Sequence, residues 1–203
     1  MPRSTKTAAL LRLAKTRPVR ARDLEAAGIP RTYLRRMVER GLLEQSARGV
    51  YRLADSDVTE LHSLAQVAVR VPRGIICLVS ALQVHGLTTE APHAVWLMID
   101  GKARAPTLDT PAIEIVRASG AALAHGVELR RIEGVDVRIT SPAKTVADCF
   151  RYRRHVGLDV ATRALREYLQ PPRRPARSID ALVAAARADR ITTVIRPYLE
   201  ALA

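Results

Sequence analysis

Two pairs of oppositely charged side chains have a spacing that lets them act together. Lys144 and Asp148 are four residues apart, so a helix would place both on one face. If this is the polar face of the helix, we expect the two side chains to form a surface ion pair that contributes less than about 0.5 kcal/mol to stability. The alternative is a site that contacts a partner or a nucleotide phosphate. Asp100 and Lys102, which follow an apolar segment, would offer the same two kinds of group.

Standard catalytic and metal-binding patterns are absent from the sequence. The five histidines form no HxH or HExxH motif, so no metal site is expected. Neither GxxxxGK[ST] nor GxGxxG occurs, so no standard phosphate loop exists and no cofactor is expected. A nuclease-like pair, Asp100 and Glu114, lacks a lysine two residues after the glutamate, where Val116 stands. His85, which precedes a glycine, is predicted to form a hydrogen bond at a helix end.

The positive charge lies mainly in the first quarter of the chain. The formal net charge is +13 over 203 residues. Residues 1–54 hold 13 Lys and Arg against 4 Asp and Glu, whereas residues 55–203 hold 20 against 16. A concentrated positive charge favours a polyanionic partner such as nucleic acid.

The same N-terminal segment has the pattern of a winged helix-turn-helix. Turn residues separate three predicted helices, over 4–15, 21–27 and 31–40, and a hairpin is predicted over 42–53. In the third helix Leu34, Met37 and Val38 have the spacing of a buried stripe. The second helix of a helix-turn-helix motif, here the predicted helix over 31–40, enters the major groove of DNA. The alternative is a winged helix that docks on a protein.

The residues predicted to contact DNA are mostly arginines on and around the third helix. Arg35 and Arg36 lie away from the buried stripe, and an arginine fork can bond bidentately to guanine. Arginines in the preceding helix and in the wing would hold phosphates. The full set is Arg20, Arg22, Arg31, Thr32, Tyr33, Arg35, Arg36, Arg40 and Arg48.

Residues 55–203 are predicted to form a second, mixed α/β domain with a helical C-terminus, so the fold class is α+β. Strands are expected over 94–99, 113–118, 127–131 and 135–139, and helices over 55–70, 80–86, from 142, 158–169 and 179–202 with a break near Pro197. The segment 151–177 carries eight arginines against two acidic residues. It is either a solvated helix face with a linker, or a surface for DNA phosphates or an acidic partner.

No feature of the sequence points to a membrane. No run of about 18 uncharged apolar residues occurs, and the charged start of the chain lacks a signal-peptide cleavage site. The two cysteines, Cys77 and Cys149, form no disulfide-like pattern. We therefore expect a cytoplasmic protein with reduced thiols and no membrane partner.

Five segments in this order resemble the AbiEi family of type IV antitoxins, over nearly the whole chain. They are residues 28–36, 48–53, 80–88, 140–148 and 196–202. The resemblance implies an N-terminal winged helix that represses its own operon by binding an inverted repeat in the operator DNA. It also implies a C-terminal domain that neutralises a cognate nucleotidyltransferase-type toxin.

Three functions remain open at this point. The first is the autorepressing antitoxin just described. The second is an antitoxin that acts as an atypical serine/threonine protein kinase on the toxin, with ATP and Mg²⁺, for which Asp100, Lys102, Lys144 and Asp148 are the candidate catalytic residues. The third is a plain winged-helix regulator whose second domain senses a small molecule.

Overall fold

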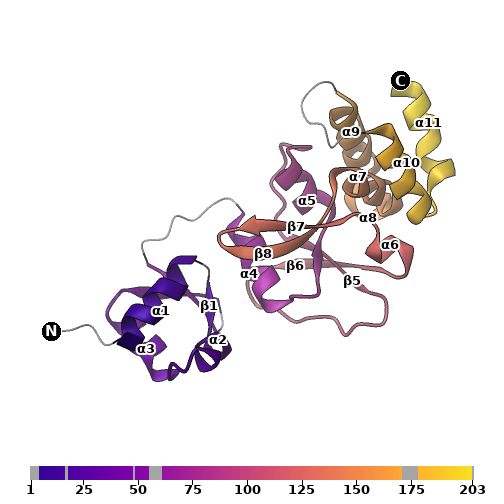
Figure 1. Ribbon diagram of the computed structural model, residues 1–203. Helices are drawn as coiled ribbons and strands as arrows, with labels where there is room; N and C mark the ends of the chain where they lie inside the picture. The colour runs from indigo at the N-terminus through magenta and orange to yellow at the C-terminus, as the bar shows by residue number, and fades with distance from the viewer. Residues whose placement is uncertain (1–4, 17, 48, 55–60, 171–177, 203) are drawn as a thin grey trace. The chain divides into compact units, whose positions relative to one another are not determined.

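The computed structural model describes residues 5–16, 18–47, 49–54, 61–170 and 178–202. The chain divides into two compact units. The N-terminal unit comprises residues 1–70 and 131–136, and the second unit comprises residues 71–130 and 137–203 (Figure 1). The predicted start of a helix at 55–57 and the predicted linker at 171–177 lie outside the described residues.

Three helices and a three-stranded sheet form the first part of the chain (Figure 1). The helices are α1 (Thr5–Thr16), α2 (Ala21–Ala26) and α3 (Thr32–Glu39), and the strands are β1 (Val19–Arg20), β2 (Leu43–Ala47) and β3 (Val50–Leu53). The sheet has the order β1-β3-β2, with both pairs antiparallel. This arrangement is the predicted winged helix-turn-helix, with β2 and β3 as the wing.

Glycines set the ends of the helices in this motif. Gly28 follows α2 with φ +67° and Gly41 follows α3 with φ +65°, conformations that only glycine adopts cheaply. Leu34 and Met37 of α3 are buried as predicted, together with Leu24 of α2. The prediction for Val38 is wrong, because this side chain is 36% exposed.

A five-stranded mixed sheet carries the second half of the fold. Its strands are β4 (Ile75–Ile76), β5 (Val95–Asp100), β6 (Ile113–Ala118), β7 (Val127–Ile132) and β8 (Val135–Thr140), in the order β6-β5-β4-β8-β7. Strand β5 runs parallel to β6, whereas β4 is antiparallel to β5 and parallel to β8. Glu133 and Gly134 join β7 to β8 with φ +46° and +74°, the positive values that a two-residue type I′ hairpin needs.

The remaining helices are α4 (His62–Arg70), α5 (Leu78–His85), α6 (Ala121–Ala124), α7 (Pro142–Arg151), α8 (Arg153–Val156), α9 (Leu158–Leu169), α10 (Ile179–Ala188) and α11 (Thr192–Leu202). The predicted break near Pro197 is wrong, because α11 continues through this proline. The chain turns instead at Arg190, whose φ of +57° ends α10. None of the described helices has the length and apolar character that crossing a bilayer requires.

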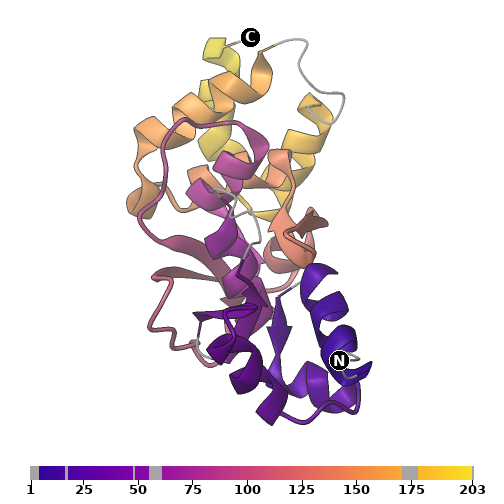
Figure 2. The same ribbon diagram turned by 90° about the vertical axis from the view of Figure 1, so that its left-hand side faces the viewer.

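Helix α7 lies at the centre of the second unit's core. It packs against α5, α9 and α10, and its residues 143–150 are all buried. Val146 and Phe150 belong to one apolar cluster with Met98 of β5 and Leu165 of α9. Helices α9, α10 and α11, coloured orange to yellow, gather in one part of the ribbon in both views (Figures 1 and 2), and each of them contacts α7. A helix covered on so many sides has no polar face left for solvent.

Candidate nucleic-acid interface and a buried ion cluster

The exposed side of α3 is mostly basic. Leu34 and Met37 face the core, while Arg35, Arg36 and Arg40 are exposed. Arg31 and Thr32 at the start of the helix are also exposed, and the half-buried Tyr33 packs against the core of the winged helix. A helix built in this way presents cations on the face that the fold leaves open.

Not all of these arginines are equally available. The Nε of Arg35 lies 2.9 Å from Oε1 of Glu39, one turn further along, and the Nε of Arg31 lies 2.7 Å from Oε1 of Glu25. Within the described residues, Arg36 and Arg40 form no ion pair. Exposed ion pairs contribute little, with a median of about 0–1 kcal/mol, so a DNA phosphate or base could displace the carboxylates.

The other predicted DNA contacts come from the start of α2 and from the wing. The backbone N–H of Arg20, the residue before α2, donates to Oδ2 of Asp23 at 2.9 Å, which fixes the first turn. Arg20 is half-buried and Arg22 is exposed. Arg48, predicted at the wing tip, lies outside the described residues.

The second candidate site begins with a well-capped helix. The N–H of Lys144 donates to Oγ of Ser141 at 3.3 Å, and Pro142 occupies the first turn of α7. These features place Lys144 and Asp148 one turn apart, as predicted. The prediction that the pair lies on the surface is wrong: the side chains are 1% and 0% exposed. Helices α5, α9 and α10 pack around α7, and Asp189 at the end of α10 contacts the face that the local pattern assigned to solvent.

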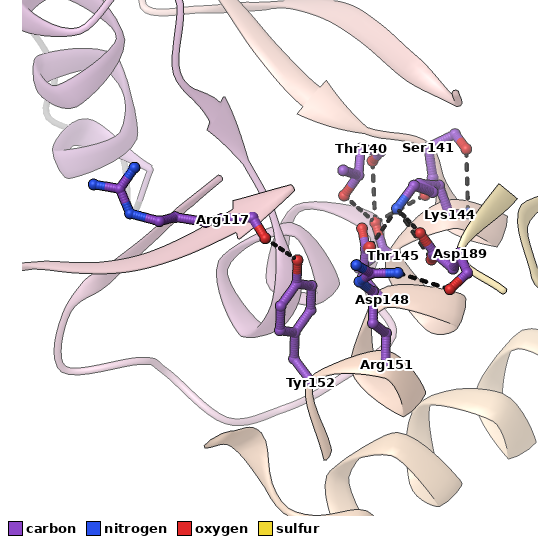
Figure 3. Close-up of polar contacts among 9 residues, drawn as sticks. All are labelled: Arg117, Thr140, Ser141, Lys144, Thr145, Asp148, Arg151, Tyr152 and Asp189. Carbon is purple, nitrogen blue, oxygen red and sulfur yellow. Dashed lines mark hydrogen bonds and ion pairs between the residues drawn. The ribbon is translucent and has the colours of Figure 1, made fainter. Parts of the chain in front are cut away.

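A third charged residue completes a buried ion cluster, which comprises Lys144, Asp148 and Asp189. Nζ of Lys144 donates to Oδ1 of Asp148 and also to Oδ1 and Oδ2 of Asp189, at 2.9 and 3.1 Å (Figure 3). Asp189 is the C-cap residue that follows α10, and it is 1% exposed. Sequence reasoning missed it. The available signal was an acidic residue at a helix C-terminus, where the helix dipole disfavours negative charge.

Two carboxyl groups share one ammonium group in this cluster. Burial raises the pKa of Asp148; Lys144 opposes this shift and Asp189 adds to it. Burial alone would lower the pKa of Lys144, but Asp148 and Asp189 outweigh it and the pKa is raised. The charged form of the amine is therefore favoured, and the neutral form of Asp148 is favoured more than it would be in water.

Hydrogen bonds around the cluster fix α7 against its neighbours. The ring Nε2 of His85 donates to the carbonyl oxygen of Thr140 at 2.7 Å, which is the helix-end hydrogen bond predicted for this histidine. The hydroxyls of Thr140 and Thr145 lie 2.7 Å apart. Burial, with a further effect of Asp148, raises the pKa values of Cys77 and Cys149, so both thiols are protonated and unreactive.

The four candidate catalytic residues do not form one site. Asp100 is the exposed last residue of β5 and Lys102 lies in the exposed turn that follows, where the N–H of Lys102 donates to Oδ1 of Asp100 at 2.8 Å. Lys144 and Asp148 are buried, and no contact in the described part of the chain joins the two pairs. The described residues also hold no group of three His, Cys, Asp or Glu side chains placed for a metal ion.

Gly126→Ala is expected to destabilise the second unit by about 2–4 kcal/mol. A Cβ at Gly126 would lie 2.8 Å from Cβ of Lys144 and 2.9 Å from Oγ of Ser141, and φ is +62°. The cost combines overpacking, about 1–3 kcal/mol, with positive-φ strain of about 1 kcal/mol. Gly86→Ala is the control, since Gly86 has φ +61° and ψ +40°, in the left-handed helical region, and a Cβ there meets nothing within 4 Å. Equal losses in urea unfolding would contradict the predicted clash.

Asp148 is expected to contribute stability that decreases as the pH rises above about 4. Folding raises the pKa of this group above its ordinary value of 3.8. The native state thus keeps a proton that the unfolded chain loses. This contribution is complete below the unfolded pKa and is lost as the pH rises through the native pKa. Asp148→Asn should remove this contribution from the pH dependence of the urea midpoint, whereas Asp180→Asn, an exposed change on α10, should leave the pH dependence unchanged. Parallel curves for all three proteins would refute this assignment.

Taken together, these elements define a winged helix-turn-helix protein with a second α/β unit. Residues 8–54 match the family model described as "Transcriptional regulator, AbiEi antitoxin". This match supports a role as an antitoxin and regulator, and it agrees with the resemblance found in the sequence.

Two further comparisons concern the whole chain. No curated protein matches it. Among solved structures it is similar to the RV2827C protein from Mycobacterium tuberculosis, with 15% identity and a TM-score of 0.54, over 96% of this chain and 79% of that one. At this identity the likeness shows the fold alone.

Proposed function

We propose that this protein is a DNA-binding autorepressor of a toxin–antitoxin system and that its second unit neutralises a nucleotidyltransferase-type toxin. The observation that carries the DNA-binding part is the basic exposed face of α3, within a segment that matches the AbiEi regulator family. The toxin-neutralising part rests on the family resemblance of the sequence.

Helix α3 is the proposed recognition helix. Its arginines have the forks that read guanine in the major groove, and Arg36 and Arg40 have no carboxylate partner among the described residues. In this proposal Arg20 and Arg22, at the start of α2, hold phosphates. An inverted repeat would be read by two copies of the chain, one on each half-site.

The toxin-neutralising surface must lie outside the ion cluster. The segment 140–148, which contributes to the resemblance, is explained by packing, because Thr140, Lys144, Thr145 and Asp148 are all buried. These side chains cannot touch a toxin while the unit is folded. Exposed positions of the second unit are therefore the ones to vary in a search for toxin contacts.

The DNA part of the proposal is tested by fluorescence anisotropy with two duplexes of equal length. One is the sequence upstream of the protein's own gene and the other is a shuffled version. Preferential binding is expected, with an affinity that falls steeply between about 50 and 200 mM salt as phosphate counterions are released. Equal affinity for both duplexes would contradict operator recognition.

The toxin part is tested by growth rescue. The neighbouring nucleotidyltransferase gene is induced with or without the full chain, and with the Arg35→Ala/Arg36→Ala variant. Rescue by both proteins is expected, because neutralisation belongs to the second unit. Failure of the wild-type chain to rescue would refute the antitoxin part and leave the DNA result standing.

A further inference from the structure

A pocket of about 460 Å³ in the second unit is lined by three arginines. Gly101, Arg117 and Ser119 contribute from the ends of β5 and β6, and Arg151 and Arg190 from the ends of α7 and α10. We propose that this pocket binds the phosphate group of a small phosphorylated molecule. This function is separate from DNA recognition by α3.

The charges around the pocket favour an anion. All three charged side chains that line it are arginines, and no acidic residue lines it. Asp189 is adjacent, but its carboxylate accepts hydrogen bonds from Lys144 in the buried cluster. Among the described residues, none of Arg117, Arg151 and Arg190 forms an ion pair. Their positive charge is therefore not neutralised by the protein.

Two of these arginines are fixed by bonds to neutral groups. Nη1 of Arg151 donates to the backbone carbonyl of Asp189 at 2.7 Å (Figure 3), and its guanidinium lies 5.5 Å from the centre of the Tyr152 ring. Nη1 of Arg117 donates to the carbonyl oxygens of Asp100, Gly101 and Ala103, at 3.2, 3.0 and 2.8 Å. These bonds hold the side chains in place without neutralising them. The guanidinium group of Arg117 points away from Arg151 (Figure 3), so Arg151 is the preorganised cation of the pocket and the exposed Arg190 is the second cation that a ligand would meet.

Arg190 stands where glycine is the usual residue. Its φ of +57° is left-handed, and it follows the end of α10, a position at which helices commonly place Gly or Asn. The side chain is exposed and has no hydrogen-bond partner among the described residues. Arg190 therefore places an exposed cation at the edge of a basic pocket, in a backbone conformation that glycine would adopt at lower cost.

The chemistry of the pocket points to phosphate on a small molecule. Arginine forks match the oxygens of phosphate, and the volume lies in the range of small-molecule sites, about 300–1,000 Å³. Another pocket of the second unit, of about 310 Å³, is lined by Arg163, Arg166 and Glu167 among others and lacks this character. There Arg163 pairs with Glu90 at 2.7 Å and Asp159 at 3.0 Å.

The test is isothermal titration of the full chain at constant ionic strength. The probes are inorganic phosphate, pyrophosphate and a 5′-nucleoside monophosphate, with chloride as the reference. We expect binding of at least one phosphate probe, weakened at least about tenfold in Arg190→Gly. The same variant should keep or raise its thermal unfolding midpoint, because glycine suits the left-handed position. Arg187→Ala, an exposed change on the same helix outside the pocket, should bind like the wild type.

Three results would overturn the proposal. One is the absence of binding by every phosphate probe to the wild-type chain. Another is an equal loss in Arg187→Ala, which would indicate a general charge effect. The third is loss of DNA affinity in Arg190→Gly with phosphate binding unchanged, which would assign Arg190 to the DNA interface.

Discussion

Replacing Lys144 with methionine is expected to destabilise the second unit by about 3–5 kcal/mol, the range for breaking a buried ion pair by removing one partner. Methionine fills much of the volume of the lysine stem but leaves Asp148 and Asp189 buried side by side without a cation. The side chains of these two residues are each 0% exposed, so water cannot replace the lost ammonium group.

The measurement is urea unfolding followed by the fluorescence of Trp96, the single tryptophan, which lies in β5 of the second unit. Lys102→Met removes an exposed lysine from the same unit and should change stability by less than about 0.5 kcal/mol. A triple variant with Lys144→Met, Asp148→Asn and Asp189→Asn should recover part of the loss, because it removes the uncompensated charge. A loss below about 1 kcal/mol in Lys144→Met would contradict the buried cluster and match an exposed pair.

The second large effect is expected on DNA binding. The double variant Arg35→Ala/Arg36→Ala should lose about 1–3 kcal/mol of operator affinity for each base contact removed. Both side chains are exposed, so the folded state should be unchanged. If these arginines read bases, discrimination against the shuffled duplex should fall while the salt dependence changes little. If they hold phosphates, the salt slope should drop by about 1 for each contact.

The second unit offers a closely matched control for this variant. Arg196 pairs with Glu200 at i, i+4, with 2.8 Å between Nε and Oε1, as Arg35 pairs with Glu39 at 2.9 Å. Arg187, like Arg36, has no ion pair among the described residues. The variant Arg187→Ala/Arg196→Ala therefore removes the same charge from the same kinds of environment. Equal losses of operator affinity in both double variants would show that the effect comes from net charge alone. Unchanged operator affinity in Arg35→Ala/Arg36→Ala would exclude α3 as the recognition helix.

Much of the winged helix could be predicted because its signals are local. Gly28 and Gly41 mark helix ends through their own backbone preferences, and the buried positions Leu34 and Met37 recur with the helical period. Val38 shows the limit of this reasoning. It satisfies the same period but lies at the edge of the buried stripe, and whether such a position is covered depends on which elements pack beside it.

The ends of the last two helices show the same limit. Proline at 197 predicts a break from its missing N–H, yet α11 continues through it, while Arg190 ends α10 in a conformation that arginine rarely adopts. Local preferences disfavour both outcomes. The continuous helix at Pro197 and the positive φ of Arg190 are kept because the surrounding packing fixes the path of the chain. Ile191 and Ile195, which follow the turn, are both buried.

By itself the sequence determined the α+β class, the winged helix, the positive charge near α3 and the pairing of Lys144 with Asp148, since each depends on residue type and near-neighbour spacing. Only the tertiary structure decided that this pair is buried and that Asp189, 45 residues away, completes it. It also brought Arg117, Arg151 and Arg190 to one pocket. The physical reason is that helical spacing fixes which side chains share a face, whereas the burial of that face depends on elements distant in the chain.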